Sequence, residues 1–247
     1  MSNAHKVSLL PLKNQLVGVP FDSFHLCVDE NSFGIQYGDM VLPSVQSGVT
    51  ITNGRFWMAT RIPQNSQLFY PTSILNPNGS TISGWFMCPQ IHQSSSGNMG
   101  IQGNWYLPII EIAPTENKGT VGYLSIMVEP DAAGYSRRVV LALPNNTSYT
   151  TGKQIENNTW YHFAIVFNKD QYILYINGKV EHAIANCSAV SLSTSMLMIG
   201  GGYRGQPNIV MDEILVDRFM RTSDEIEMFY NANQPFYNPY DYRIYAY

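Results

Sequence analysis

The order of apolar and polar residues predicts a protein built almost entirely of β-strands. Thr159–Phe167 is apolar or aromatic on both faces and too short to cross a membrane, which is typical of a central strand covered on each side. Asn168–Gln171 separates it from a second apolar run, Tyr172–Ile176. Asn177-Gly178 predicts a tight type I′ turn into a third strand at Lys179–Ile184, because both residue types accept positive φ angles. The pattern predicts an antiparallel meander.

The chain after this meander continues with short core strands and then changes to a helical period. Met196–Ile199 is an apolar run that stops at a glycine triplet. Ile209–Val216 is a second such run, with the carboxylate pair Asp212-Glu213 in its middle. Thr222–Glu225 matches a capping box and predicts the start of a short C-terminal helix. The residues that then share one helical face are Ile226, Phe229 and Tyr230.

The chain before the meander reads as short strands separated by polar loops. Gln64–Asn78 is an irregular loop with two prolines, and Pro144–Asn158 is a polar loop. The longest loop, Gln90–Asn104, is rich in Ser, Gly, Asn and Gln, and loops of this length are often functional. The strands that we expect here are Val7–Leu12, Leu16–Val19, a hairpin within His25–Val41, Arg55–Ile62, Thr81–Met87, Leu107–Ala113, Thr120–Val128 and Arg137–Leu143.

Five short motifs, taken in their order along the chain, resemble the C-terminal half of a laminin-G-like domain. They are Trp160-Tyr-His, Leu174-Tyr-Ile-Asn-Gly178, Met198-Ile-Gly-Gly201, Met211-Asp-Glu-Ile214 and Ser223-Asp-Glu-Ile-Glu227. Thr81–Phe86 resembles the early core strand of the same family, so the resemblance covers Val49–Tyr230.

This family belongs to the concanavalin A-like jelly rolls. The resemblance implies an all-β fold, an antiparallel two-sheet β-sandwich with one short C-terminal helix. We expect a single domain over residues 7–233, with N-terminal strands in 7–48 packed on it. An aromatic C-terminal segment, 234–247, follows.

The composition narrows the range of partners. Charged residues make up only 13% of the chain, the net charge is −4, and Arg137-Arg138 is the only basic doublet. Nucleic-acid binding needs a basic stripe, so we expect no nucleic-acid partner. The chain starts without a secretory signal and contains no apolar run near the ~20 residues of a membrane helix. We therefore expect a soluble protein that folds in a cytoplasm and does not insert into a membrane.

Motifs for catalysis are incomplete. Some relatives of the resembled fold are hydrolases that present two carboxylates on an E-x-D-x-x-E strand, and retaining hydrolysis needs the two groups about 5 Å apart. The nearest match is Glu129-Pro-Asp131, where Gly134 takes the third acidic position and Pro130 interrupts the strand. Gly200–Gly205 matches G-x-G-x-x-G, but a strand follows it in place of the helix that a dinucleotide site needs. We expect no enzymatic activity.

Aromatic residues beside amides suggest a sugar-binding rim, because a ring stacks on C–H groups while amides bind hydroxyls. Successive loops of an antiparallel sandwich alternate between its ends. Counted from Thr81–Met87, this rule places Gln90–Tyr106, Glu129–Ser136 and Cys187–Thr194 at one rim, and Pro144–Asn158 and Gly200–Asn208 at the other. For each aromatic, the alternative is packing at the edge of the core. The candidate ligand-binding residues are His92, Gln102, Asn104, Trp105, Tyr106 and Tyr135 on the first rim, and Tyr203 and Arg204 on the second.

Asp212 is the candidate metal ligand. In families that the chain resembles, an acidic residue on the last core strand helps to hold a structural calcium ion, and the remaining ligands would be backbone carbonyls. The alternative is that Asp212 anchors a neighbouring loop by hydrogen bonds. No other cofactor is expected.

The aromatic segment after the helix suggests a partner. Gln234–Tyr247 is too rich in Tyr to stay exposed, so we expect it to cover an edge of its own domain or another subunit of a homo-oligomer. Pro235–Pro239, directly after the helix, resembles tail and baseplate structural proteins of phages and prophages. The sequence thus favours a non-catalytic virion protein that binds a cell-surface or cell-wall glycan. The alternatives are a structural decoration or assembly protein that binds other proteins, and a hydrolase with an unrecognised site.

Overall fold

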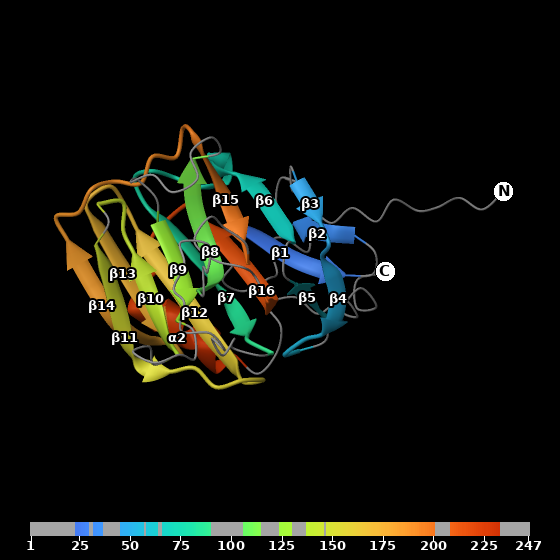
Figure 1. Ribbon diagram of the computed structural model, residues 1–247. Coiled ribbons are helices and arrows are strands. Elements are labelled where there is room, and N and C mark those ends of the chain that lie inside the picture. The colour runs from blue at the N-terminus through green and yellow to red at the C-terminus, as the bar shows by residue number, and fades with distance from the viewer. Residues whose placement is uncertain are drawn as a thin grey trace, which may run out of the picture.

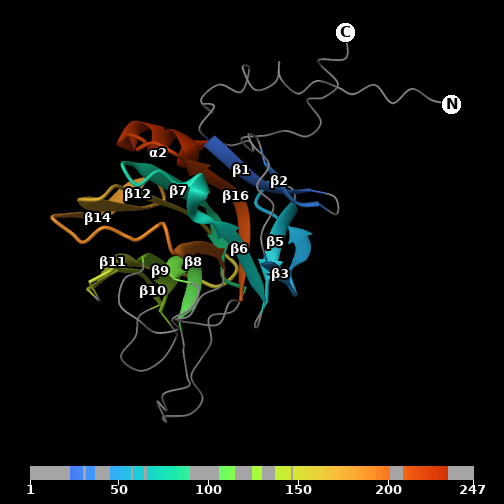
Figure 2. The same ribbon diagram turned by 90° about the horizontal axis from the view of Figure 1, so that it is seen from above.

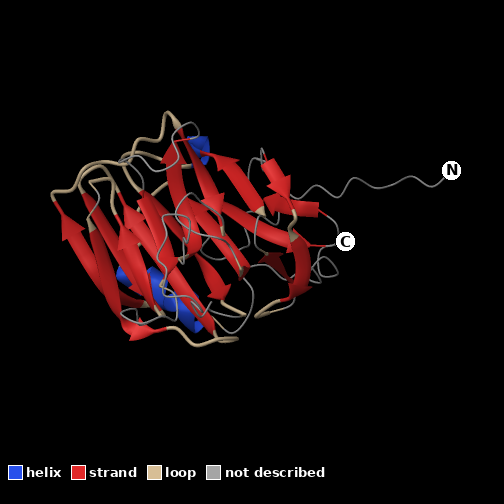
Figure 3. Ribbon diagram, in the orientation of Figure 1, coloured by secondary structure: helices blue, strands red, loops and turns tan. Residues whose placement is uncertain are grey.

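Two antiparallel β-sheets pack face to face and enclose the hydrophobic core. The computed structural model describes residues 23–29, 32–36, 45–56, 58–63, 66–89, 106–114, 124–129, 137–145, 147–200 and 208–232. Strands dominate this part of the chain, with one short α-helix and a 3₁₀ turn (Figure 3). The expected all-β, antiparallel two-sheet sandwich with a short C-terminal helix is confirmed.

The larger sheet has nine strands and runs across the view of Figure 1 in the order β14-β13-β12-β7-β16-β1-β2, with β5 paired to β16 and β4 paired to β5. Its strands are β14 (Lys179–Ala185), β13 (Gln171–Ile176), β12 (Trp160–Phe167), β7 (Ser80–Met87), β16 (Ile209–Asp217), β1 (Ser23–Asp29), β2 (Ser32–Gln36), β4 (Thr50–Asn53) and β5 (Met58–Ile62).

The second sheet has seven strands in the order β11-β10-β9-β8-β15-β6-β3. A 3₁₀ turn, η1 (Thr72–Ile74), follows β6. The strands are β11 (Ser148–Gln154), β10 (Arg138–Ala142), β9 (Leu124–Val128), β8 (Leu107–Pro114), β15 (Ser195–Ile199), β6 (Gln67–Pro71) and β3 (Val45–Ser47).

The central strands are apolar on both faces because both faces are covered. β12 pairs with β7 along its whole length, from Trp160 opposite Met87 to Phe167 opposite Ser80. Phe163 and Ile165 point into the core between the sheets, whereas Ala164 and Val166 belong to a separate cluster on the outer face. That outer cluster is closed by the helix α2 (Ser223–Asn231), which lies on the outer side of the larger sheet (Figure 2).

Helix α2 is fixed by a capping box and by a buried ion pair. The hydroxyl of Thr222 accepts a hydrogen bond from the Glu225 amide, and the Glu225 carboxylate accepts one from the Thr222 amide, as its sequence predicted. Arg221, just before the helix, binds the carboxylate of Asp217 at the end of β16 with Nε and Nη2. Both of these side chains are buried, so the pair holds the helix start onto the sheet.

Three sequence-based element boundaries are wrong. The predicted polar loop Pro144–Asn158 contains the strand β11, and the predicted loop Gln64–Asn78 contains β6 and η1. The sequence pattern did not predict β11, because this edge strand has mostly exposed, polar side chains and lacks an apolar face. β5 begins at Met58, three residues after the start that the sequence suggested.

The additional strand β11 reverses the expected positions of the later loops. Strands β7, β9 and β15 all finish at one end of the sandwich, which we call the Tyr106 end. At this end, Trp160 pairs with Met87, and Leu107 pairs with Val128. Segments 90–105, 130–136 and 201–207 all join strand ends at this end. Cys187–Thr194 connects β14 to β15 at the opposite end, so its predicted place beside Gln90–Tyr106 is wrong, as is the separate rim predicted for Gly200–Asn208.

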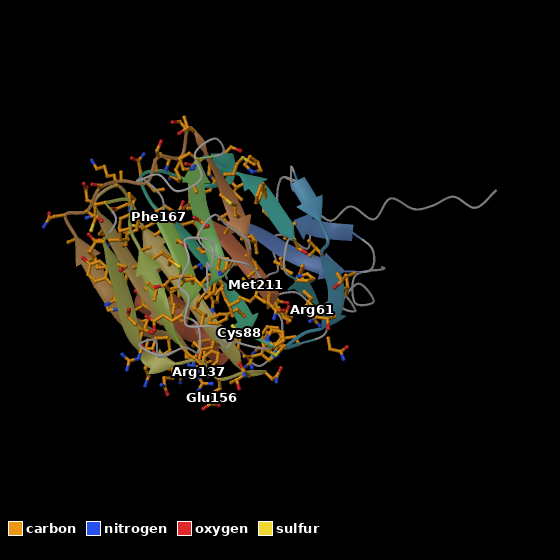
Figure 4. All side chains as sticks on the ribbon, in the orientation of Figure 1. Arg61, Cys88, Arg137, Glu156, Phe167 and Met211 are labelled. Carbon is orange, nitrogen blue, oxygen red and sulfur yellow. The ribbon has the colours of Figure 1, made fainter. Side chains whose placement is uncertain are left out.

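Figure 4 gives landmarks for these two ends. The labelled Cys88, Arg137 and Glu156 lie toward the Tyr106 end, and Phe167 lies toward the other. Hydrogen bonds close the sandwich between its sheets and loops at the Tyr106 end. The Asn158 amide donates to the carbonyl of Cys88 at 2.8 Å, and the Ile155 amide donates to that of Arg137 at 2.7 Å.

Candidate functional site

Four polar or aromatic residues lie side by side across the smaller sheet at the Tyr106 end. Leu107 of β8 and Val139 of β10 both pair with Val128 of β9. Their neighbours in the sequence, Tyr106, Arg138 and Glu129, therefore lie at one level across the three strands. Arg138 in turn pairs with Gln154 on β11. We call Tyr106, Glu129, Arg138 and Gln154 the terminal row. Neighbouring strands are about 4.8 Å apart, so the row spans roughly 14 Å.

The terminal row faces away from the core. Leu107, Val128 and Val139 are buried in the cluster between the sheets, and successive side chains of a strand point to opposite faces. Tyr106, Glu129 and Arg138 are half-buried and Gln154 is exposed. The four side chains are therefore partly exposed on the outer face of the smaller sheet.

An apolar patch on the outer face of the smaller sheet lies next to the terminal row. Tyr106 packs against a small cluster formed by Met127, Val140 and Ala142 on the outer face of β9 and β10. This contact fixes one side of the ring and leaves the side chain half-buried. A ring held in this way loses little entropy when a ligand stacks on it.

Arg138 is the most unusual member of the row. Its Nε atom is shielded from solvent, yet it makes no hydrogen bond among the residues that the structure describes. The preceding residue, Arg137, has a φ angle of 52°, in the left-handed region that non-glycine residues rarely adopt. Backbone strain of this kind is often found where side chains are held for function.

The sequence located part of this site. Tyr106 is the member of the predicted rim that the structure describes, and it combines the packing role with partial exposure. Gln154 was missed as a ligand-binding candidate because it lies on the unpredicted strand β11. Glu129 and Arg138 were missed because their alignment depends on the registers of β8, β9 and β10, which the sequence does not give; the doublet Arg137-Arg138 was the available signal. The predicted residues outside the described part of the chain are His92, Gln102, Asn104, Trp105, Tyr135, Tyr203 and Arg204.

A second group of aromatic and charged residues lies on the outer face of the larger sheet. His162, Trp85 and Asp212 are neighbours on β12, β7 and β16. The guanidinium of Arg55 lies 3.7 Å from the centre of the Trp85 ring, and Tyr230 of α2 stacks on that ring at 5.8 Å. We call these residues the Trp85 cluster.

The Trp85 cluster is closed. Trp85 is only 2% exposed and His162 is fully buried. Neither ring nitrogen of His162 has a hydrogen-bond partner in the described structure. Burial and the charge of Arg55 lower the pKa of His162 to about 3, so the imidazole is neutral at physiological pH. A ligand could reach this cluster only after Arg55 and Tyr230 had moved.

Asp212 has the contacts of a loop anchor. Its Oδ2 accepts hydrogen bonds from the backbone amides of Arg55 at 2.7 Å and Phe56 at 3.3 Å. Burial and the neighbouring charge of Glu213 raise the pKa of Asp212 to about 7, although hydrogen bonds from the backbone of Phe56, Arg55 and Glu213 act in the opposite direction. No group of three or more metal-binding side chains occurs among the described residues. A structural calcium ion at Asp212 stays a prediction.

The position of Asp212 depends on a β-bulge. Glu213 has a φ angle of 50°, and the pairing of β16 with β7 shifts between Asp212 and Leu215. The bulge brings β16 so close to Gly84 that a Cβ atom there would lie 2.5 Å from Cδ1 of Ile214. The same Cβ atom would lie 3.1 Å from the backbone atoms O of Glu213 and Cα of Ile214, so glycine at position 84 suits the close approach of the two strands.

Two antiparallel sheets with a helix on one outer face define a β-sandwich of the jelly-roll class. A laminin-G family model, described as the concanavalin A-like lectin/glucanases superfamily, matches residues 63–227. The chain therefore belongs to the concanavalin A-like lectin/glucanases superfamily. A comparison with curated protein sequences found no match.

Solved structures share this fold at low sequence identity. Domain 4 of AbnA, an extracellular arabinanase from Geobacillus stearothermophilus in complex with arabinotriose, is 16% identical over 75% of this chain and 82% of that chain, with a TM-score of 0.57. A structure of botulinum neurotoxin type C, whose cell entry depends on interaction with two ganglioside molecules, is 14% identical over 85% of this chain and 51% of that chain, with a TM-score of 0.59.

A third similar structure is an enzyme. Trypanosoma rangeli sialidase in complex with the inhibitor DANA is 12% identical over 87% of this chain, with a TM-score of 0.61. The present chain covers only 33% of the sialidase and about half of the toxin chain. These likenesses show the fold alone. Among the described residues, no helix is long and apolar enough to span a membrane.

Proposed function

We propose that this protein is a non-catalytic, lectin-like module that binds a cell-surface or cell-wall glycan at the Tyr106 end. The observation that carries the proposal is the terminal row, which sets an aromatic ring, a carboxylate, a guanidinium and an amide at one level of the outer face. The three segments that join strand ends at the same end contain the remaining seven sequence-predicted binding residues.

The chemistry of the row suits a saccharide. A tyrosine ring can stack on the C–H face of a sugar, while carboxylate, amide and guanidinium groups bind its hydroxyls. The complex of the arabinanase domain with arabinotriose, and the interaction of the botulinum toxin with two ganglioside molecules, support the idea that this fold can engage carbohydrate. They support the proposal without identifying the glycan.

The acidic residues favour binding over hydrolysis. Glu129 is followed by Pro130 and Asp131, which do not continue a strand with two carboxylates on one face. Asp212, a buried carboxylate of the larger sheet, is 7% exposed and accepts hydrogen bonds from the backbone of a loop. Turnover of cell-wall polysaccharides by the purified chain would favour the hydrolase alternative that the sialidase and arabinanase neighbours leave open.

The biological setting that we propose is a phage or prophage tail or baseplate. The support is the resemblance of Pro235–Pro239 to such structural proteins, at the place where α2 ends. Mass spectrometry of purified particles tests this setting. The alternative, a decoration or assembly protein that binds only other proteins, would give particles that contain the chain but a glycan array without signal.

Trp105→Ala tests the glycan site. We expect glycan-array binding to fall at least thirtyfold, because a central aromatic contact contributes about 2 kcal/mol or more, while the melting temperature stays nearly constant. Trp160→Ala, at the same end but on the larger sheet, is the matched control and should keep binding. A large loss of stability in Trp105→Ala would assign Trp105 to the core and remove it from the site.

A further inference from the structure

We propose that the terminal row selects an acidic saccharide, such as one containing a uronic or sialic acid, and that Arg138 binds its carboxylate. This inference rests on the proposed glycan-binding function and adds the class of ligand. It depends on three features of the row: the unpaired guanidinium nitrogen, the strained arginine beside it, and the balance of charge along the four strands.

The first feature is the unpaired Nε of Arg138. A buried donor without a partner carries a desolvation cost that a ligand can remove by supplying an acceptor. A planar guanidinium matches a carboxylate with two parallel hydrogen bonds, which are shorter and stronger than bonds to a neutral hydroxyl. An acid group is thus the ligand that would gain most from Arg138.

The second feature is the left-handed backbone at Arg137. This conformation lets the carbonyl of Arg137 accept the Ile155 amide while β10 starts at Arg138, whose own carbonyl accepts the Glu129 amide at 2.9 Å. Hydrogen bonds therefore join β10 to its neighbouring strands, β9 and β11, on both sides of Arg138. The backbone that carries the guanidinium is fixed on two sides, which lowers the entropy lost when it binds an anion.

The third feature is the charge of the surroundings. Arg137-Arg138 is the only basic doublet in a chain with 14 Lys and Arg residues and a net charge of −4. Glu129 lies between Tyr106 and Arg138 and balances the formal charge of the row. Nucleic acid would find no stripe of positive charge along this row, whereas a single carboxylate among hydroxyls can meet Arg138 and leave Gln154 as a hydroxyl partner.

Titration calorimetry with matched acidic and neutral sugars tests the inference. The probes are sialyllactose against lactose, and oligogalacturonate against its methyl ester. For at least one pair, we expect the acidic member to bind about tenfold or more tightly than the neutral one, and the difference to shrink as salt is added. Arg138→Met keeps the aliphatic stem and should reduce the affinity for the acidic member to that of the neutral one.

Two further variants separate charge from folding. Arg138→Lys keeps the charge without the planar fork and should retain only part of the preference. Arg218→Met, an exposed arginine at the opposite end, should retain all of it. Neutral sugars that bind as tightly as acidic ones, or a preference that survives Arg138→Met, would overturn the inference and leave glycan binding intact. Failure of every saccharide, on these probes and on the array, would overturn both.

Discussion

The two outer faces of the sandwich hold similar residue types in opposite states. The terminal row on the smaller sheet and the Trp85 cluster on the larger sheet each combine an aromatic ring, an arginine and a carboxylate. In the row, Gln154 is exposed and the guanidinium of Arg138 has an unpaired nitrogen. In the cluster, Arg55 already lies on the ring of Trp85, and Asp212 is occupied by two backbone amides.

The difference in exposure between the two groups shows that residue type alone does not define a binding site. Covered by α2 and by the segment that carries Arg55, the Trp85 cluster acts as a small second core that holds these parts to the sheet. The terminal row has no comparable cover among the described residues. Substitutions in the closed region should therefore change stability without changing ligand affinity, and substitutions in the row should do the reverse.

The largest expected effect on stability is at the ion pair that holds α2. Asp217→Ala leaves the buried guanidinium of Arg221 without its main partner, and we expect a loss of about 3–5 kcal/mol in the free energy of unfolding. Chemical denaturation followed by circular dichroism measures it. Asp170→Ala, which removes an exposed carboxylate 4.0 Å from Lys169, is the control and should cost less than about 1 kcal/mol. Equal losses would show that the pair does not fix the helix.

A smaller effect, on the order of 2 kcal/mol, is expected from the titration of Asp212. Its folded-state pKa of about 7 lies above the ordinary 3.8. The protonated group therefore contributes stability at low pH, and this contribution is lost as the pH rises through 7. The stability of wild type relative to Asp212→Asn should fall as the pH is raised from about 4 to about 7, and the difference should stay constant above that pH.

The difference between these two proteins isolates Asp212, because His162 is common to both. The pKa of His162 is lowered, so its contribution has the opposite sign and is lost as the pH falls below about 6.5. A pH-independent difference would mean that Asp212 is ionised normally in the folded protein.

Calcium binding by Asp212 is tested in the same samples. If Asp212 holds a structural calcium ion, chelator should lower the melting temperature of wild type, and Asp212→Asn should remove that sensitivity. Differential scanning fluorimetry with and without excess chelator measures the shift. An unchanged melting curve would leave the loop-anchor role alone, consistent with the amide bonds from Arg55 and Phe56.

The smallest effect on the domain itself is expected from the C-terminal segment. The period-two tyrosines after α2 predict a strand that adds to a sheet edge or a partner subunit. Deletion of Tyr237–Tyr247 should lower the mass measured by light scattering and cost each protomer about 1 kcal/mol, with glycan affinity per protomer unchanged. A soluble truncation with the same mass and stability would contradict this role.

The amino-acid sequence predicted the fold better than the site, for a physical reason. Strands such as β12 and β13 are apolar on both faces, and the turn Asn177-Gly178 has the expected positive φ angles of 50° and 76°. β11 has no such signal, because an edge strand needs only Tyr149 and Thr151 toward the core. One missed strand was enough to assign later loops to the wrong end, and the register that aligns Arg138 with Gln154 depends on that strand.

The gathering of three connecting segments at one end also has a practical consequence. Segments 90–105, 130–136 and 201–207 are each flanked by strands that pair with a neighbouring strand on both sides. Changes of sequence or length in them need not disturb the ladders, and lengthening a loop costs little free energy. The domain could therefore serve as a display scaffold, in which these segments are randomised over a constant terminal row and selected against new carbohydrates.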